Sequence, residues 1–177
     1  IERNGMVFTY LGEGEPPSLP AYDCFAAPAE YSFAFKGLID ANWLQALEVG
    51  IDPAHASFLH RFFEDDDPED GYGQQFRDAT DEIPVTKLLR ENVRPQIEAE
   101  ETGYGLRIFA RRDLGNAVTH VRVTNFAFPN AIVIPMSAEM TITQWHVPVS
   151  DTECYWYALF TGFEKQVDHK AMRAQRL

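Results

Sequence analysis

The fold is decided by residues 96–111, which read QIEAEETGYGLRIFAR. The segments 96–101 and 104–111 are separated by Thr102 and Gly103, a pair typical of the turn in a β-hairpin. Further downstream, four more strands are expected at residues 118–126, 131–136, 140–148 and 154–163. Consecutive strands with short connections predict an antiparallel sheet.

Upstream of this sheet the pattern is mixed. Residues 6–11 and 31–35 read as strands, and residues 41–49 have the apolar spacing of a helix, with Asp40 as the expected N-cap. Residues 168–177 begin a second helix. One early helix and one late helix around consecutive strands predict an α+β fold built on an antiparallel sheet.

Composition and charge narrow the class of protein. Of the 177 residues, 45% are apolar and 13% aromatic, which is typical of a compact globular chain. The formal net charge of −12 disfavours binding to a nucleic acid and gives no attraction to an anionic membrane surface. The acidic, glycine-containing residues 64–81 are interpreted as a solvated loop, with an active-site lid as the alternative.

Cysteine usage and the chain ends bear on the cellular context. Cys24 and Cys154 stand in no Cys-x2-Cys spacing, so we expect free, reduced thiols in a cytoplasmic protein. No apolar run is long enough for a membrane span, and no signal peptide precedes the first strand. Because the chain starts at Ile1 without a methionine and stops at Leu177 within a helical pattern, we interpret it as a fragment.

Candidate metal ligands occur in residues 42–60, which read NWLQALEVGIDPAHASFLH and contain Asp52-x2-His55-x4-His60. Two imidazoles and a carboxylate suit a non-haem Fe(II) oxygenase site, in which one coordination face stays open for dioxygen. His55 and His60 would lie about 140° apart around a regular helix, so they share a metal only if that helix is bulged or broken. Gly50 and Pro53 are natural causes of such a break. Taken alone, two histidines at this spacing are usually one core and one surface residue, and an aspartate such as Asp52 is usually an N-cap.

The whole passage resembles the iron-binding signature of Rieske oxygenase large subunits, and most closely the phthalate-dioxygenase-like branch. Residues 4–8 (NGMVF) look like the last strand of the preceding Rieske domain. Residues 62–67 (FFEDDD), 119–125 (THVRVTN) and 144–149 (QWHVPV) resemble the catalytic domain of that branch. The similarity covers nearly the full chain in the same order.

The resemblance implies specific roles. His55 and His60 would be ligands of a mononuclear Fe(II). Asp52 would be a bridging carboxylate that hydrogen-bonds the far ring nitrogen of His55 and, across a subunit boundary, a histidine of a neighbour's [2Fe–2S] cluster. The flanking residues expected to line a substrate pocket are Glu48, Val49 and Ala56.

The resemblance also implies a domain organisation. Residues 1–12 would end a Rieske domain, 13–30 would be a linker, and 31–177 would form a helix-grip catalytic domain, an antiparallel sheet wrapped around a helix. No Cys-x-His and Cys-x2-His pair is present, so the cluster ligands are expected upstream of the chain. The third iron ligand, a carboxylate, is expected beyond Leu177. Asp151 is interpreted instead as a turn residue and Asp168 as a helix start.

The function implied is that of the oxygenase component of an aromatic-ring-hydroxylating dioxygenase. It would take dioxygen, electrons from a ferredoxin or flavin reductase, and an aromatic substrate, commonly carboxylated in this branch, and would assemble as a homotrimer. The alternatives are a Rieske-type O-demethylase or other monooxygenase of the same fold, and a non-catalytic helix-grip ligand-binding module. The basic side chains that could hold a carboxylate are Lys87, Arg90, Arg107 and Arg122, none of which the sequence places at a pocket.

The remaining conspicuous side chains have ordinary interpretations. His120 and His146 lie in strand patterns and are expected to be packed or surface residues, with the border of the pocket as the alternative for His146. His169 is expected to be exposed on a helix. The aromatic residues 155–157 alternate with apolar neighbours and predict sheet core.

Overall fold

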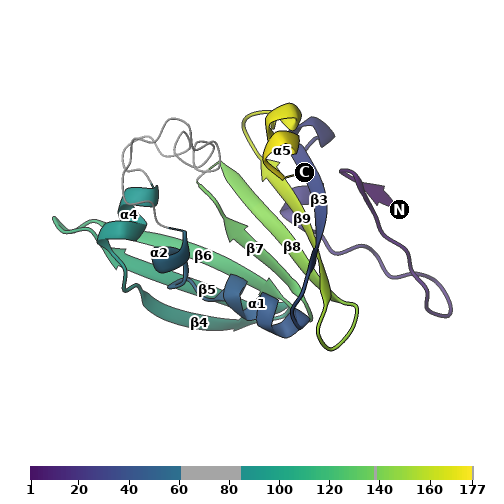
Figure 1. The fold of residues 1–177 in the computed structure, drawn as a ribbon, viewed down its shortest axis with the longest axis horizontal. Coiled ribbons are helices and arrows are strands. Elements are labelled where there is room, and N and C mark those ends of the chain that lie inside the picture. The colour runs from purple at the N-terminus through teal and green to yellow at the C-terminus, as the bar shows by residue number, and fades with distance from the viewer. Residues whose placement is uncertain (61–84, 138, 177) are drawn as a thin grey trace.

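A seven-stranded antiparallel sheet forms the framework of the molecule (Figure 1). The computed structural model describes residues 1–60, 85–137 and 139–176. The spatial order of the strands is β3-β9-β8-β7-β6-β5-β4, so β4 to β9 pair in chain order and β3 joins beyond β9. The strands are β3 (Ser32–Ile39), β4 (Gln96–Thr102), β5 (Gly105–Asp113), β6 (Thr119–Ala127), β7 (Ala131–Pro135), β8 (Met140–Pro148) and β9 (Cys154–Gly162).

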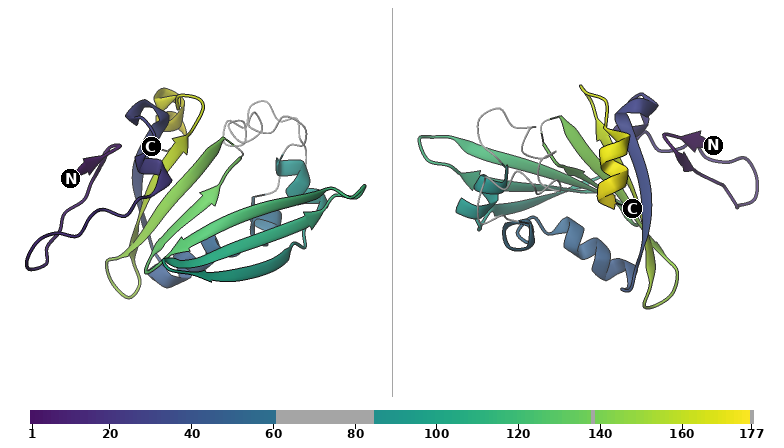
Figure 2. Two further views of the ribbon diagram at one scale, coloured as in Figure 1. Left: turned by 180° about the vertical axis from the view of Figure 1, so that it is seen from behind. Right: turned by 45° about the horizontal axis from the view of Figure 1, so that its top comes forward.

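Helices cover one face of this sheet. Helix α1 packs against β7 and β8, α2 lies beside α4, and α5 packs against β3. The two further views show the sheet curving around α1 and α2 (Figure 2). The helices are α1 (Trp43–Ile51), α2 (Ala56–Leu59), α4 (Val85–Glu91) and α5 (His169–Arg176), and the short 3-10 turns are η1 (Asp23–Phe25) and η2 (Ala29–Tyr31). The predicted α+β, helix-grip class is confirmed, whereas α4 was not predicted.

The core lies on the inner face of the sheet. Because side chains alternate between the two faces of a strand, every second residue of each strand contributes to it. Ile142 pairs across the ladder with Ile134 on one side and with Phe160 on the other, so all three point to the same face. Leu47 of α1, only 1% exposed, packs into this layer with Ile132. Burying one such aliphatic side chain stabilises the fold by about 2 kcal/mol.

The helix is broken beside Pro53, one of the two residues expected to cause an irregularity. Helix α1 ends at Ile51, and Asp52 is extended (φ −71°, ψ 110°) because the residue before a proline is pushed out of the helical region. Helix α2 then begins at Ala56, with His55 as its N-cap and His60 as its C-cap. The break therefore places both histidines at the ends of one short helix.

The start of α1 corrects the predicted N-cap. The N-cap is Asn42 rather than Asp40, and its side-chain oxygen accepts the backbone N–H of Leu44 at 2.9 Å. A cap must directly precede the first helical residue to reach these free N–H groups, and the helix begins at Trp43. Asp168, by contrast, starts α5 as predicted, since its carboxylate accepts the N–H groups of Lys170 and Ala171.

The first residues of the chain pack on the outer face of the sheet. Only Met6–Val7 (β2) of the predicted strand 6–11 is strand, paired with Glu2–Arg3 (β1). The rings of Phe8, Tyr22 and Phe25 surround the outward-facing Trp145, with centroids 5.6–6.1 Å from its ring. This aromatic cluster covers the side of β8 opposite to α1.

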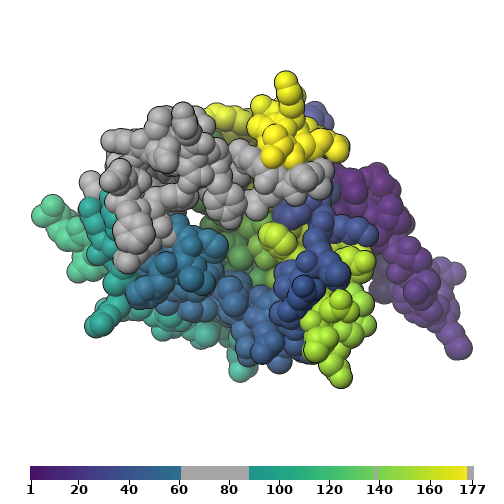
Figure 3. Space-filling view, in the orientation of Figure 1, coloured from purple at the N-terminus to yellow at the C-terminus, as the bar shows by residue number. Residues whose placement is uncertain are grey.

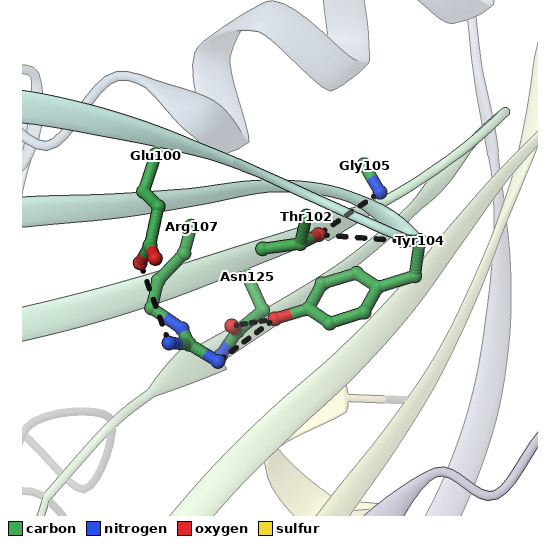
Figure 4. Close-up of polar contacts among 6 residues, drawn as sticks. All are labelled: Glu100, Thr102, Tyr104, Gly105, Arg107 and Asn125. Atoms are coloured by element: carbon green, nitrogen blue, oxygen red, sulfur yellow. Dashed lines mark hydrogen bonds and ion pairs between the residues drawn. The ribbon is translucent and has the colours of Figure 1, made fainter.

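The predicted hairpin at residues 96–111 is present and is reinforced on its outer face (Figure 4). Thr102 Oγ1 accepts the backbone N–H of Gly105, where any Cβ would lie 2.3 Å from a backbone oxygen of Phe126. The hydroxyl of Tyr104 donates to Asn125 at 2.8 Å. Arg107 pairs with Glu100 at 3.4 Å on the face opposite to the core.

Other expectations have plain outcomes. Both cysteines are free and buried, and burial raises the pKa of the Cys24 thiol to about 11. Residues 64–81, interpreted as a loop or lid, lie outside the described residues. No helix within the described ranges combines the length and the apolar character that a membrane span requires.

Candidate metal centre and substrate cavity

A cavity of about 310 Å³ lies between the α1–α2 segment and the inner face of the sheet. Figure 3 shows the surface hollowed beside α1 and α2, with the strands as its floor. Its size is at the lower end of the range for small-molecule sites. The apolar lining residues are Ile39, Ala46, Val49, Gly50, Pro53, Ala56, Leu89, Ile134, Met136, Ile142 and Phe160. The lining residues with a polar group are Asp52, His55, His60, Arg122, Thr124, Gln144, His146 and Trp156.

The two predicted ligands lie side by side on the helical wall of this cavity. The ring centroids of His55 and His60 are 5.2 Å apart, with the ring planes at 79°. Imidazoles that bind one ion through nitrogen at about 2.1 Å, at an angle of about 90–110°, have centroids roughly 4.5–5.3 Å apart. The observed separation therefore fits two donors of one metal ion.

The main chain sets the tautomer of His55. Its Nδ1 makes a short contact with the backbone oxygen of Asp52, which can only accept, so Nδ1 carries the proton and donates it. When the ring is neutral, Nε2 then carries the lone pair that can bind a metal. A neutral ring with one nitrogen held by an oxygen is the usual arrangement of a histidine ligand in a metal site.

The carboxylate of Asp52, expected to contact the His55 ring, makes other hydrogen bonds in this structure. That carboxylate accepts the backbone N–H groups of Ala54 and His55, at 2.8 and 3.1 Å. The physical reason is that the first N–H groups of α2 have no partners within their own helix and need nearby acceptors. The ring contact comes from the backbone oxygen of Asp52 instead.

His60 is also held in the form that binds metals. Desolvation lowers its pKa first, and the positive charges of His55 and Arg122 lower it further. A lowered pKa favours the neutral imidazole, which is the state that donates to a metal ion. Within the described ranges, no group of three or more His, Cys, Asp or Glu side chains comes together. The two imidazoles are thus the donor set present, and they fit part of an Fe(II) coordination sphere.

Arg122 brings a positive charge to the cavity from the sheet side. It lies on β6, with its Nε buried and lacking any hydrogen-bond partner among the described residues. Burial, together with the charge of Arg112, lowers its pKa to about 10, so the guanidinium stays charged at neutral pH. Of the four basic candidates, Arg122 is at the cavity, Arg107 is on the outer face, Arg90 is not a lining residue, and the side chain of Lys87 is outside the described part.

His146 borders the cavity, which was the alternative interpretation of this residue. It lies on β8, is 3% exposed, and is paired across the ladder with Trp156. Burial lowers its pKa to about 4, so it is neutral near pH 7. His120 is partly buried on β6 without lining the cavity, and His169 is exposed on α5, where its ring contacts Phe33.

The predicted pocket residues divide between the cavity and the surface. Val49 and Ala56 line the cavity, whereas Glu48 is exposed on α1 and does not. Sequence reasoning missed the polar contributions of Thr124, Gln144 and Trp156. The sequence pattern that could have found these three residues is the alternation of side chains within each strand. That pattern assigns each residue to one face of the sheet, but it does not show which face packs against the helices.

A helix-grip domain with paired imidazoles in its cavity wall is the class of protein that this fold and site define. The family model described as "LigXa C-terminal domain like" matches residues 9–175, and the chain belongs to this family. Together with its relatives, the match identifies the chain as a Rieske oxygenase catalytic domain.

The relatives are oxygenase subunits. The chain is 33% identical over 168 residues to the phthalate 4,5-dioxygenase oxygenase subunit of Pseudomonas putida, covering 91% of this chain and 36% of the relative. It is 29% identical over 181 residues to CarAa, the terminal oxygenase component of carbazole 1,9a-dioxygenase from Metapseudomonas resinovorans, covering 88% and 44%. The chain therefore spans less than half the length of these relatives.

Solved structures confirm the fold. The terminal oxygenase of carbazole 1,9a-dioxygenase from Nocardioides aromaticivorans IC177 superposes with a TM-score of 0.54 at 14% identity, covering 98% of this chain and 51% of that chain. The corresponding oxygenase from Novosphingobium sp. KA1 gives 0.52 at 14% identity, covering 98% and 50%.

Proposed function

We propose that this chain is the catalytic part of an oxygenase component that hydroxylates an aromatic carboxylate with dioxygen at a mononuclear Fe(II). The observation that carries the proposal is the pair of adjacent imidazoles, His55 and His60, in the wall of a largely apolar cavity that Arg122, whose Nε is buried, also lines. A carrier protein with no metal has no need for paired imidazoles of this kind.

His55 and His60 would hold the iron. When bound, the iron would activate dioxygen, using electrons from a reductase or ferredoxin. The chain's own contribution is to orient the metal ligand His55 and to exclude water from the cavity. The backbone oxygen of Asp52 holds the Nδ1 proton of His55, which keeps Nε2 directed away from it. Apolar lining residues such as Ile142 and Phe160 would hold the aromatic ring and keep water out.

Arg122 would bind the carboxylate of the substrate. A planar guanidinium matches a carboxylate with two parallel N–H donors, and the apolar surroundings strengthen that interaction. Within the described residues, Arg122 has no carboxylate of the protein in hydrogen-bond contact, which leaves its donors for a ligand. The ring attached to that carboxylate would then lie along the apolar floor of the cavity.

Asp52 would carry the link to the electron donor. Its carboxylate is exposed and accepts two hydrogen bonds, while a carboxylate has about four lone-pair sites, so acceptor capacity remains. A histidine of a [2Fe–2S] cluster from a neighbouring subunit could donate to it, as in a homotrimer. Electrons would then have a short route that passes the backbone of His55.

Iron analysis of the full-length protein tests the metal site. We expect the iron content to fall at least tenfold in His55→Ala and in His60→Ala, because each variant removes one donor. His169→Ala, a change on exposed α5, is the matched control and should keep full iron. Wild-type iron content in both cavity variants would reject the proposal.

Substrate selection tests the role of Arg122. Removing a charged hydrogen-bond donor to a buried carboxylate costs about 1.5–3 kcal/mol, so Arg122→Met should lower kcat/KM for an aromatic carboxylate roughly 10- to 150-fold. Arg111→Met, which removes a charge from the outer face, is the control. Equal kcat/KM values in the two variants would refute carboxylate binding by Arg122. Labelled dioxygen would show whether one or both oxygen atoms enter the product.

A further inference from the structure

Arg112 is the largest fully buried side chain of the described protein, at 2% exposure. It lies on β5 and points toward the helices, opposite to its outward-facing neighbour Arg111. Its Nε donates to the backbone oxygen of Asn92 at 2.9 Å. Its Nη2 donates to the backbone oxygen of Pro53 at 3.2 Å and lies 3.3 Å from Ser57 Oγ.

These acceptors enclose the segment that carries the first candidate ligand. Pro53 lies two residues before His55, within the break, and Ser57 lies two residues after it, in α2. Asn92 directly follows α4, which packs beside α2. One guanidinium therefore connects the sheet to both sides of His55 and to the end of the neighbouring helix.

A buried charge in this position is not explained by packing alone. None of the contacts of Arg112 within the described ranges is with a carboxylate, and its Nη1 is buried without a hydrogen-bond partner there. Burying a charge without a counter-charge is costly, and an apolar side chain of similar size often packs at least as well. What an apolar side chain lacks is a rigid fork of donors that holds several acceptors at fixed relative positions.

We propose that Arg112 is a positioning residue for the metal centre, an inference that rests on the proposed function. By binding the Pro53 carbonyl and the Ser57 hydroxyl, it fixes the bend of the chain around His55 and so keeps that imidazole beside the imidazole of His60. Within the described part of the chain, residues 52–55 between α1 and α2 make no other hydrogen bond to the sheet. Residues that orient metal ligands from behind typically change metal affinity 10- to 100-fold when replaced.

The test compares four variants of the full-length protein loaded with Fe(II): Arg112→Met, Arg112→Lys, Ser57→Ala and, as the control with the same charge change, Arg111→Met. The rate of iron release to a ferrous chelator is measured for each, together with the EPR spectrum of the nitric oxide adduct of the Fe(II). We expect release to be at least tenfold faster in Arg112→Met and a few-fold faster in Arg112→Lys and Ser57→Ala. The EPR line shape should broaden in the Arg112 variants, and Arg111→Met should match the wild type in both measurements.

The variant Leu159→Ala distinguishes a positioning role of Arg112 from a general loss of stability. Leu159 is fully buried but lies on the side of the sheet opposite to the cavity. If Leu159→Ala, at an equal loss of Tm, releases iron as fast as Arg112→Lys, the positioning role is overturned. Wild-type release and line shape in both Arg112 variants would overturn it as well. If neither Arg112 variant folds, Ser57→Ala decides: faster release supports the role, and unchanged release rejects it. A wild-type protein without bound iron would instead reject the proposed function itself.

Discussion

The buried imidazole of His146 makes the stability of the chain depend on pH in a way that can be worked out from the structure. Its folded pKa is about 4, against an ordinary value of 6.5, because burial disfavours the charged ring. Between these values the unfolded chain binds a proton that the folded chain excludes, so His146 lowers stability progressively as the pH falls from 6.5 to 4.

The magnitude follows from the width of that interval. Each pH unit within it is worth about 1.4 kcal/mol, which limits the full effect to about 3 kcal/mol. Between pH 7 and pH 4.5, the titration of His146 should lower the free energy of unfolding by about 2 kcal/mol, which is most of the full effect. His146→Gln removes the titrating ring, so the variant should lose about 2 kcal/mol less than the wild type over this interval.

The assay is urea unfolding of the 177-residue chain, followed by tryptophan fluorescence at pH 7 and pH 4.5. The comparison of wild type with His146→Gln cancels the contributions of the other acidic and basic groups. His169→Gln, which removes a histidine from the surface of α5, should lose as much stability as the wild type. Identical losses in the wild type and in His146→Gln would show that the ring is not kept neutral by burial and would refute the reasoning.

Three further changes test the fold and the site. Leu47→Ala should lower the free energy of unfolding by about 3 kcal/mol, because it leaves a cavity between α1 and the sheet, as thermal and urea unfolding would show. Asn42→Ala should lower it by about 1 kcal/mol through loss of the cap on α1, whereas Asp40→Ala should change it by less than about 0.5 kcal/mol; equal effects would contradict the cap assignment. Asp52→Asn should retain bound iron and a reducible cluster but stop substrate oxidation in the full-length protein, and normal coupled turnover would count against the bridge.

Local signals were sufficient where neighbours along the chain control the structure. The strand predicted at residues 140–148 matches β8 residue for residue, because its turns and its alternation are both local. The helix break followed from Pro53, which constrains the residue before it. Local signals failed at Asp40, which lies two residues too early for a cap, and at Val85–Glu91 (α4), which was not predicted.

The candidate site shows the same division. His55 and His60 were found from their spacing and from the resemblance of their surroundings to a known signature. Arg122 could not be separated from Arg107, because alternation places both on a definite face of their strands without saying which face meets α1. The strand register decides this. Arg107 of β5 pairs with Asn125 of β6 on the outer face. Arg122 lies an odd number of residues before Asn125 on β6, so its side chain points to the opposite, inner face.

By itself, the amino-acid sequence determined the strands from residue 96 onward, the break in the helix near Pro53 and the spacing of the two histidines, because each depends on residues within a few positions of one another. Only the tertiary structure decided which charges enter the cavity. It also decided that the backbone oxygen of Asp52 holds the His55 ring, and that Arg112 reaches Pro53 from 59 residues away. These outcomes depend on strand register and on the packing of α1 and α2 against the sheet, and such long-range contacts leave no periodic pattern along the chain.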